Sequence, residues 1–82
     1  MTTMTRPGDP AVNAIIGGLE LLAVTNQGGV FQVRETRGFA TVGRIVRDCV
    51  DGVWAVLDVR GRRVLSASTL RDAAVEFDRR LA

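Results

Sequence analysis

The chain of 82 residues contains no histidine, no lysine and no tyrosine, and it has a single cysteine, Cys49. Without histidine, the chain cannot build a Ser-His or Cys-His nucleophile pair or an imidazole metal site. Without lysine, it cannot form a Schiff base or a phosphate-loop lysine contact. A lone cysteine forms no internal disulfide, and within an apolar run it is typical of a small core residue. These absences predict a protein that is not an enzyme and that carries no cofactor and no metal.

All eleven basic residues are arginines, yet the net charge is only +2. A lysine-free chain rich in Val, Ala and Gly is typical of high-GC coding, and small chains of this kind are often encoded by phages or mobile elements. Arginine in place of lysine also suits bidentate recognition of phosphate or carboxylate groups. The composition alone leaves both explanations open.

A hydrophobic share of 46% is ample for one core, and the length allows one domain. Residues 1–8 are predicted to be a disordered tail, and residues 9–82 a single small domain. The most apolar stretch, residues 10–24, contains Asn13 and Glu20 and is shorter than the roughly 18–20 apolar residues that span a bilayer. We therefore expect a cytoplasmic protein without membrane contact.

The first apolar segment has a helical spacing. Asp9 followed by Pro10 is typical of an N-cap and the first position of a helix, and large apolar residues then recur on one face. The other side holds smaller residues together with one leucine (Ala14, Gly17, Gly18 and Leu21). This pattern predicts an N-terminal helix, and a homodimer with those four residues at its interface. A rival interpretation ends the helix at Gly17 and makes residues 19–25 a strand.

The middle of the chain has a sequence pattern typical of β-structure. Apolar and polar residues alternate from Val30, and the dipeptides Asp51-Gly52 and Arg60-Gly61 are turn signals between apolar runs. Residues 39–48 fit either a helix or a strand, and the turn signal that follows favours the strand. The sequence therefore predicts an antiparallel meander of three to four strands across residues 30–67.

The strand after Asp51-Gly52 is apolar on both sides, with Trp54 and Val56 on one face and Ala55 and Leu57 on the other. This composition is typical of a central strand that is covered on both faces. Ser68 then precedes a final helical pattern whose apolar face holds five residues (Leu70, Ala73, Ala74, Phe77 and Leu81). The predicted fold class is α+β, with an N-terminal helix, a three- to four-stranded meander and a C-terminal helix packed on the sheet.

One basic cluster has a defined position. Arg60, Arg62 and Arg63 surround Gly61 at the tip of the last predicted hairpin, and Arg44 lies on the neighbouring strand. A hairpin tip of this kind can clamp phosphates, or it can be a solvated turn. The four arginines are the predicted nucleic-acid-binding residues. Three aspartates of the same region (Asp48, Asp51 and Asp58) lack the spacing of a known cation loop, so no metal site is predicted.

Residues 43–78 contain the runs G-R-I-V-R, G-V-W-A-V-L-D, G-R-R-V-L and S-T-L-R-D-A-A-V-E-F-D. This order of motifs resembles the AP2 and integrase arm-type DNA-binding domains. The resemblance implies a three-stranded sheet that is backed by one helix and that reads DNA with its other face. At that face this chain presents Ala55, Leu57 and Val59, where the family has polar and charged residues.

Two functions therefore remain after the sequence analysis. The first is a non-catalytic module that acts through self-association and an unknown protein partner. The second is a small DNA-binding accessory protein that uses the arginine-bearing hairpin.

Overall fold

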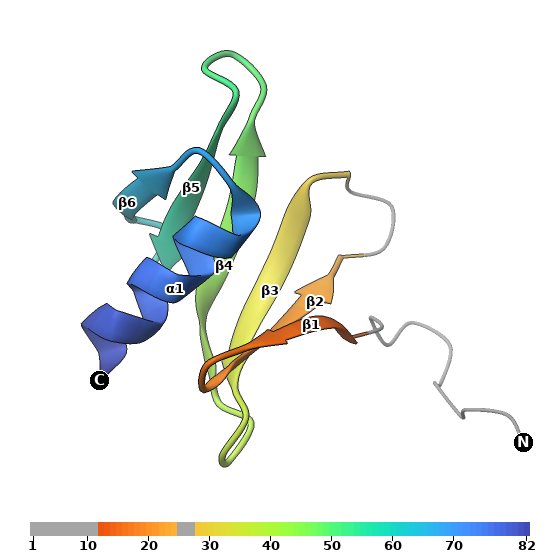
Figure 1. The fold of residues 1–82 in the computed structure, drawn as a ribbon, viewed down its shortest axis with the longest axis vertical. Helices are drawn as coiled ribbons and strands as arrows, with labels where there is room; N and C mark the ends of the chain where they lie inside the picture. Colours follow the sequence, from red (N-terminus) through yellow and green to blue (C-terminus); the bar gives the residue numbers. More distant parts are fainter. Residues whose placement is uncertain (1–11, 25–27) are drawn as a thin grey trace, which may run out of the picture.

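The computed structural model describes residues 12–24 and 28–82 of the chain. The described part contains six strands, β1 (Val12–Ile16), β2 (Leu19–Ala23), β3 (Val30–Glu35), β4 (Thr41–Asp48), β5 (Val53–Asp58) and β6 (Arg63–Ala67), followed by one helix, α1 (Leu70–Leu81). The strands form one antiparallel sheet in chain order from β1 to β6. Figure 1 shows α1 lying against one face of this sheet.

The predicted fold class is wrong, because residues 12–23 form a β-hairpin and the sheet has six strands rather than three to four. Ile16 pairs with Leu19, which leaves Gly17 and Gly18 as a two-residue turn. Gly17 has a φ of 58° and Gly18 has no positive φ, as in a type II′ hairpin turn. A glycine pair between short apolar runs favours a hairpin more strongly than the helical spacing favours a helix. The expected helix start and the tail at residues 1–8 lie outside the described residues.

After residue 28, the strands and the helix lie where the turn signals predicted them. Strands β3 to β6 lie within residues 30–67, and the ambiguous segment 39–48 contributes the strand β4. The helix begins one residue later than expected, because Thr69 rather than Ser68 is its N-cap. The Thr69 Oγ1 atom accepts a hydrogen bond of 3.0 Å from the backbone N–H of Asp72.

The core lies between α1 and the sheet face that α1 covers. Eight buried residues form it (Leu19, Leu21, Val33, Ile45, Val56, Ala73, Ala74 and Phe77). Gly43 is part of this packing, because a Cβ atom at this position would lie 3.1 Å from Phe77 Cζ and would collide with the Leu57 carbonyl oxygen. The Trp54 ring packs at the margin of the core, 6.0 Å from the Phe31 ring.

The sheet is coiled around the helix. Helix α1 contacts β4, β5 and β6 and also β1, although β1 and β6 are the two opposite edges of the sheet. Extra residues at Val42 in β4 and at Val64 in β6 interrupt the strand registers. Such bulges increase the local twist, which brings both edges toward α1. No helix in the described part of the chain has the length and apolar character needed to cross a membrane.

Candidate functional site

The sheet face opposite α1, which we call the open face, carries most of the polar strand residues. Across it, Gln32 of β3, Arg44 of β4 and Leu57 of β5 are successive register partners. Because directly paired residues point to the same side of a sheet, these three side chains share the open face. The expected alternation along β5 is confirmed, since Ala55 pairs with Val46 and Ser66 on this face, whereas Val56 pairs with Ile45 in the core.

Arg63 is bound within the open face. Its Nε atom donates a hydrogen bond of 2.9 Å to Ser66 Oγ, and its Nη1 atom lies 3.6 Å from Asp48 Oδ2. Ser66 pairs with Ala55, and Asp48 lies on the far side of β5, so the Arg63 side chain crosses β5 near Ala55. Ala55 is only 3% exposed although no helix of the described residues covers this face. The Arg63 side chain that crosses β5 here explains the burial of Ala55.

The turn between β5 and β6 is built around Asp58. The Asp58 Oδ1 atom accepts hydrogen bonds of 2.9 Å from the backbone N–H groups of both Arg60 and Arg62. The backbone N–H of Asp58 donates a hydrogen bond of 2.8 Å to the Arg62 carbonyl, and Gly61 has a φ of 83°. This geometry is that of a three-residue hairpin loop whose last position requires a left-handed residue. The turn therefore presents Arg60 from a fixed backbone.

The Asp58 carboxylate is stabilised in its charged form. The N–H of Arg62, then that of Arg60, and the positive charges of both guanidinium groups hold the pKa of Asp58 below its usual value, against a smaller opposing effect of desolvation. Asp58 therefore stays ionised at neutral pH. Its Oδ1 atom is occupied by the two backbone N–H groups, so the carboxylate shapes the turn.

A hollow of about 360 Å³ opens beside this turn. It is lined by the start of β4, the end of β5 and the turn (Thr41, Gly43, Arg44, Leu57, Asp58, Val59, Arg60 and Gly61). Arg44 and Arg60 are both exposed, and neither forms an ion pair within the described residues. Two unpaired guanidinium groups thus face one carboxylate around the hollow, and such groups bind phosphate or carboxylate ligands.

The structure brings some of the predicted nucleic-acid-binding residues together. Arg44 and Arg60 line the same hollow, and Arg62 lies on the same turn, exposed and without an ion pair among the described residues. Arg63 is separate, because its guanidinium group is bound to Asp48 and Ser66. This difference could not be predicted from the sequence, because the expected hairpin pattern does not distinguish the four arginines.

The four residues predicted for a dimer interface do not form one surface in this fold, although Gly17 and Gly18 are exposed. Leu21 is completely buried in the core, and Ala14 packs against the core from β1. Gly17 and Gly18 form the β1–β2 turn, where Gly18 N–H lies 3.4 Å from Asp78 Oδ1 of the helix. The homodimer was predicted because the four residues would share one face of a helix, and in the hairpin they do not.

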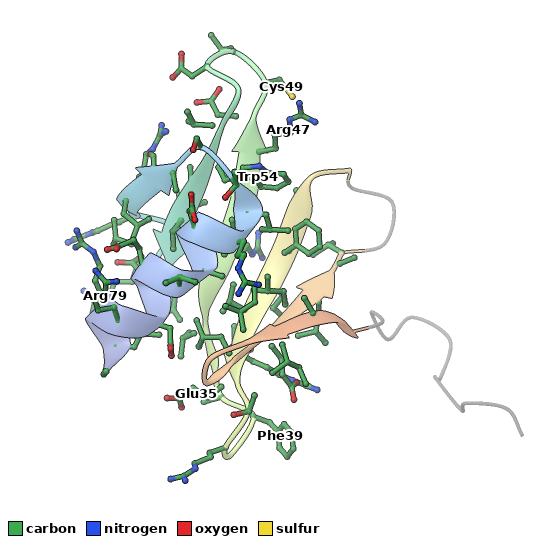
Figure 2. All side chains as sticks on the ribbon, viewed as in Figure 1. Glu35, Phe39, Arg47, Cys49, Trp54 and Arg79 are labelled. Atoms are coloured by element: carbon green, nitrogen blue, oxygen red, sulfur yellow. The ribbon has the colours of Figure 1, made fainter. Side chains whose placement is uncertain are left out.

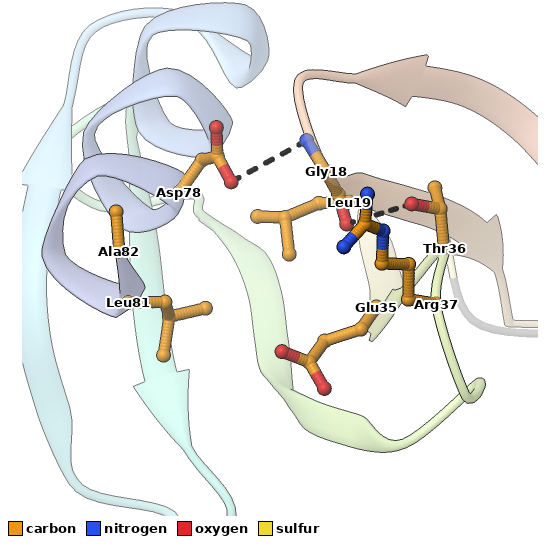
Figure 3. Close-up of a pocket in the computed structure, with 8 residues that line it drawn as sticks. All are labelled: Gly18, Leu19, Glu35, Thr36, Arg37, Asp78, Leu81 and Ala82. Atoms are coloured by element: carbon orange, nitrogen blue, oxygen red, sulfur yellow. Dashed lines mark hydrogen bonds between the residues drawn. The ribbon is translucent and has the colours of Figure 1, made fainter.

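A second hollow, of about 200 Å³, lies where this turn meets the end of α1 (Figure 3). Its floor is held by Thr36, whose backbone N–H and Oγ1 both donate to the Gly18 carbonyl at 3.0 and 3.3 Å. The charged groups around it are Glu35, Arg37 and Asp78. Two carboxylates and one guanidinium give this hollow no clear charge preference.

Cys49 is exposed in the β4–β5 turn, so its predicted core position is wrong. Asp48 pairs with Val53, which leaves a loop of four residues rather than the two-residue Asp51-Gly52 turn. Asp48 Oδ1 accepts the Val50 N–H at 2.9 Å. Asp48 and Asp58 thus serve turns at opposite ends of β5, and no group of three metal-ligating side chains gathers within the described residues.

Phe39 is a surface feature that the sequence analysis missed. It lies in the β3–β4 turn, is 60% exposed and has a φ of 59°. The preceding Thr36-Arg37-Gly38 segment marks a break, but nothing in the sequence indicates that the phenylalanine follows it with a left-handed backbone.

Comparison of the chain with models of known protein families, with curated proteins and with solved structures gives no match. The resemblance of residues 43–78 to the AP2 and integrase arm-type domains therefore stays a prediction.

Proposed function

We propose that the chain is a non-catalytic binding module for nucleic acid, which it holds through phosphate groups at Arg44, Arg60 and Arg62. The observation that carries this proposal is the hollow beside the β5–β6 turn, where Arg44 and Arg60 face solvent without an ion-pair partner among the described residues. An unpaired guanidinium keeps its five N–H donors for an external anion.

The contrast with other arginines of the same chain supports the proposal. Arg34 is bound to Glu20 at 2.7 Å, Arg63 to Asp48 at 3.6 Å, and Arg79 to Glu76 at 2.9 Å. Each of these three arginines is thus neutralised by a carboxylate. Beside the β5–β6 turn, Asp58 is the only carboxylate among the described residues that line the hollow, and its Oδ1 atom accepts two backbone N–H groups.

The arrangement of the turn also supports phosphate binding. Asp58 fixes the backbone of Arg60 and Arg62, so less conformational freedom is lost when these side chains bind a ligand. Arg44 lies on the open face of β4, and β4 pairs with β5, the first strand of the hairpin that contains the turn. Positively charged side chains on a rigid sheet and a fixed turn can follow the phosphates of one nucleic-acid strand.

The proposal is tested by the salt dependence of binding. A labelled DNA duplex and a labelled single strand are titrated with the wild type and with the Arg44→Ala/Arg60→Ala variant over a range of salt concentrations. Loss of two phosphate contacts should weaken binding and reduce the slope of log K against log salt by about 1.8 for the duplex and about 1.4 for the single strand.

The matched control is Arg71→Ala/Arg80→Ala, which removes two exposed arginines from α1, on the other side of the sheet. Both variants lose the same formal charge, so a local site predicts a much larger change for the first. Equal effects of the two variants, or no binding of either DNA by the wild type at low salt, would show that the arginine-lined hollow is not a phosphate site.

A further inference from the structure

Phe39 is the one exposed ring among the four aromatic residues of the chain. Phe77 is buried in the core, and Phe31 and Trp54 are half-buried and lie 6.0 Å apart. Figure 2 shows the Phe39 side chain at the end of the molecule formed by the β3–β4 turn, pointing away from α1. Its 60% exposure leaves most of one aromatic surface in water.

The backbone at Phe39 does not favour a phenylalanine. Its φ of 59° follows a φ of 76° at Gly38, so two successive residues have left-handed backbones. Glycine and asparagine adopt this conformation at little cost, whereas a side chain with a bulky ring does not. The turn geometry therefore gives no reason for a phenylalanine at this position, and burial gives none either.

One contact with the ring, from Arg34, and one backbone hydrogen bond of the turn orient Phe39. The Arg34 Cζ atom lies 5.0 Å from the centroid of the Phe39 ring, and Arg34 Nε donates to Glu20 Oε2 at 2.7 Å. The guanidinium group thus covers one ring face in a cation–π contact. The turn is closed by the Glu35 N–H bonding the Ala40 carbonyl at 2.8 Å. The exposed ring surface is accordingly presented in a fixed orientation.

We propose that Phe39 is a stacking platform for an unpaired base of the bound nucleic acid. This inference rests on the proposed function and narrows its ligand to strands whose base faces are accessible. Every base offers a flat π-surface to an exposed ring, and such contacts are typical of single-strand binding. The Arg34 guanidinium behind the ring adds positive charge on the side away from the base.

The position of Phe39 relative to the arginine-lined hollow supports this ligand. Thr41 lines the hollow, and it follows Phe39 by two residues, a backbone span of at most about 7 Å. Thr41 also pairs with Arg34, whose guanidinium covers the ring. A single strand with a phosphate group at Arg44 therefore passes close enough to Phe39 for a nearby base to stack on it.

The experiment compares two labelled single strands of equal length, one of deoxythymidine nucleotides and one in which every nucleotide lacks its base. Both carry the same phosphates, so both should depend on Arg44 and Arg60 to the same extent. Stacking of one base predicts that the wild type binds the thymidine strand about 5- to 150-fold more tightly than the abasic strand.

The matched variant is Phe39→Leu, which keeps an apolar side chain but removes the ring. It should bind the thymidine strand as weakly as the abasic strand, with an unchanged salt slope, because stacking releases no counterions. Phe39→Gly should behave in the same way, and its left-handed backbone is relaxed, so loss of folding is not expected to obscure the result.

The outcomes separate the two proposals. If the wild type binds both strands equally and the Arg44→Ala/Arg60→Ala variant weakens both, the phosphate site stands and stacking is wrong. If Phe39→Leu retains the full preference for the thymidine strand, the ring is not the platform, and an apolar contact with a protein becomes its better explanation. If the wild type binds a duplex but neither single strand, only the stacking proposal fails, and if it binds no DNA at all, both proposals fail.

Discussion

The two faces of the sheet use alternate residues of the same strands for different purposes. On the face covered by α1, Val33, Ile45 and Val56 are completely buried neighbours. One residue away along each strand, the open face carries Gln32, Arg44 and Leu57 instead. The covered face supplies the burial that stabilises the fold, whereas the open face carries polar side chains, of which Gln32 bonds to Thr41 and Arg44 forms no ion pair with a described residue. Substitutions on the two faces should therefore differ in what they change.

The largest effect is expected for Phe77→Ala on the covered face. Phe77 is 4% exposed and packs against Gly43, so its removal leaves a cavity between helix and sheet. We expect the free energy of unfolding to fall by about 3–5 kcal/mol, measured by urea denaturation. Val75→Ala is the control on the same helix, because Val75 is 37% exposed and its truncation should lower the free energy of unfolding far less. Similar losses for both variants would contradict the placement of the core.

Gly43→Ala should have the next largest effect, because the covered face has no room for its methyl group. The new Cβ atom would collide with the Leu57 carbonyl oxygen and lie 3.1 Å from Phe77 Cζ. A backbone atom of β5 cannot move aside as a flexible side chain can, so we expect a loss of about 1–3 kcal/mol in urea denaturation. Gly28→Ala is the control, since no atom of the described residues beyond its chain neighbours lies within 4 Å of its Cβ position. A Gly43→Ala protein as stable as this control would show that β4 and β5 pack differently.

A smaller effect concerns the charge of Asp58 in the β5–β6 turn. The pKa of Asp58 is lowered in the folded protein, chiefly by the N–H of Arg62. A lowered folded pKa stabilises the protein above the unfolded value, about 3.9, and this contribution is lost as the pH falls through the folded value. Asp58→Asn should therefore be less stable than the wild type at pH 7, and the difference should shrink below the unfolded value of about 3.9 and disappear once the pH is below the folded pKa of Asp58.

The control for this prediction is Asp51→Asn in the β4–β5 turn. The Asp51 side chain accepts no hydrogen bond from a described residue, so the thermal midpoint of this variant should equal that of the wild type at either pH. If the difference in stability between the wild type and Asp58→Asn grows as the pH is lowered, the pKa of Asp58 is not lowered in the folded protein.

The sequence predicted the part of the fold where turn chemistry and strand pattern agree. Asp51-Gly52, Arg60-Gly61 and the helix after Ser68 indicated β4 to β6 and α1, and the structure has these elements. The same turn chemistry was present at Gly17-Gly18, but the apolar residues around it also fit a helical spacing. Five-residue strands on both sides of a glycine pair are too short to show a period of two clearly. The hairpin was therefore mistaken for a helix.

The candidate site was predictable only in its residue types. The hairpin signal placed Arg60, Arg62 and Arg63 near one turn, and the strand pattern placed Arg44 beside it. Which arginines lack a partner depends on Asp48, which lies at the end of β4 and is reached by the Arg63 side chain across β5. The presentation of Phe39 depends on a left-handed backbone and on Arg34. Such long-range contacts leave no local pattern in a sequence.

The smallest predicted effect is a difference in the free energy of unfolding between two arginine substitutions on the open face. Arg63 forms a hydrogen bond with Ser66 and an ion pair with Asp48, and its side chain is 47% exposed. An ion pair of this exposure contributes about 0.2–1 kcal/mol, and Arg63→Ala should lower the free energy of unfolding by that amount in urea denaturation. Arg44→Ala removes no ion pair within the described residues, so its stability should stay within about 0.5 kcal/mol of the wild type.

The same two variants should rank in the opposite order when binding of a DNA strand is measured. Arg44→Ala should weaken binding more than Arg63→Ala, because only the Arg44 guanidinium is available to a phosphate without first breaking contacts within the protein. Salt should reduce this contrast, because it screens both the contact of Arg44 with a phosphate and the ion pair that holds Arg63 to Asp48. If Arg63→Ala weakens binding as much as Arg44→Ala and costs no stability, then Arg63 belongs to the binding surface, and its contact with Asp48 does not hold it away from a ligand.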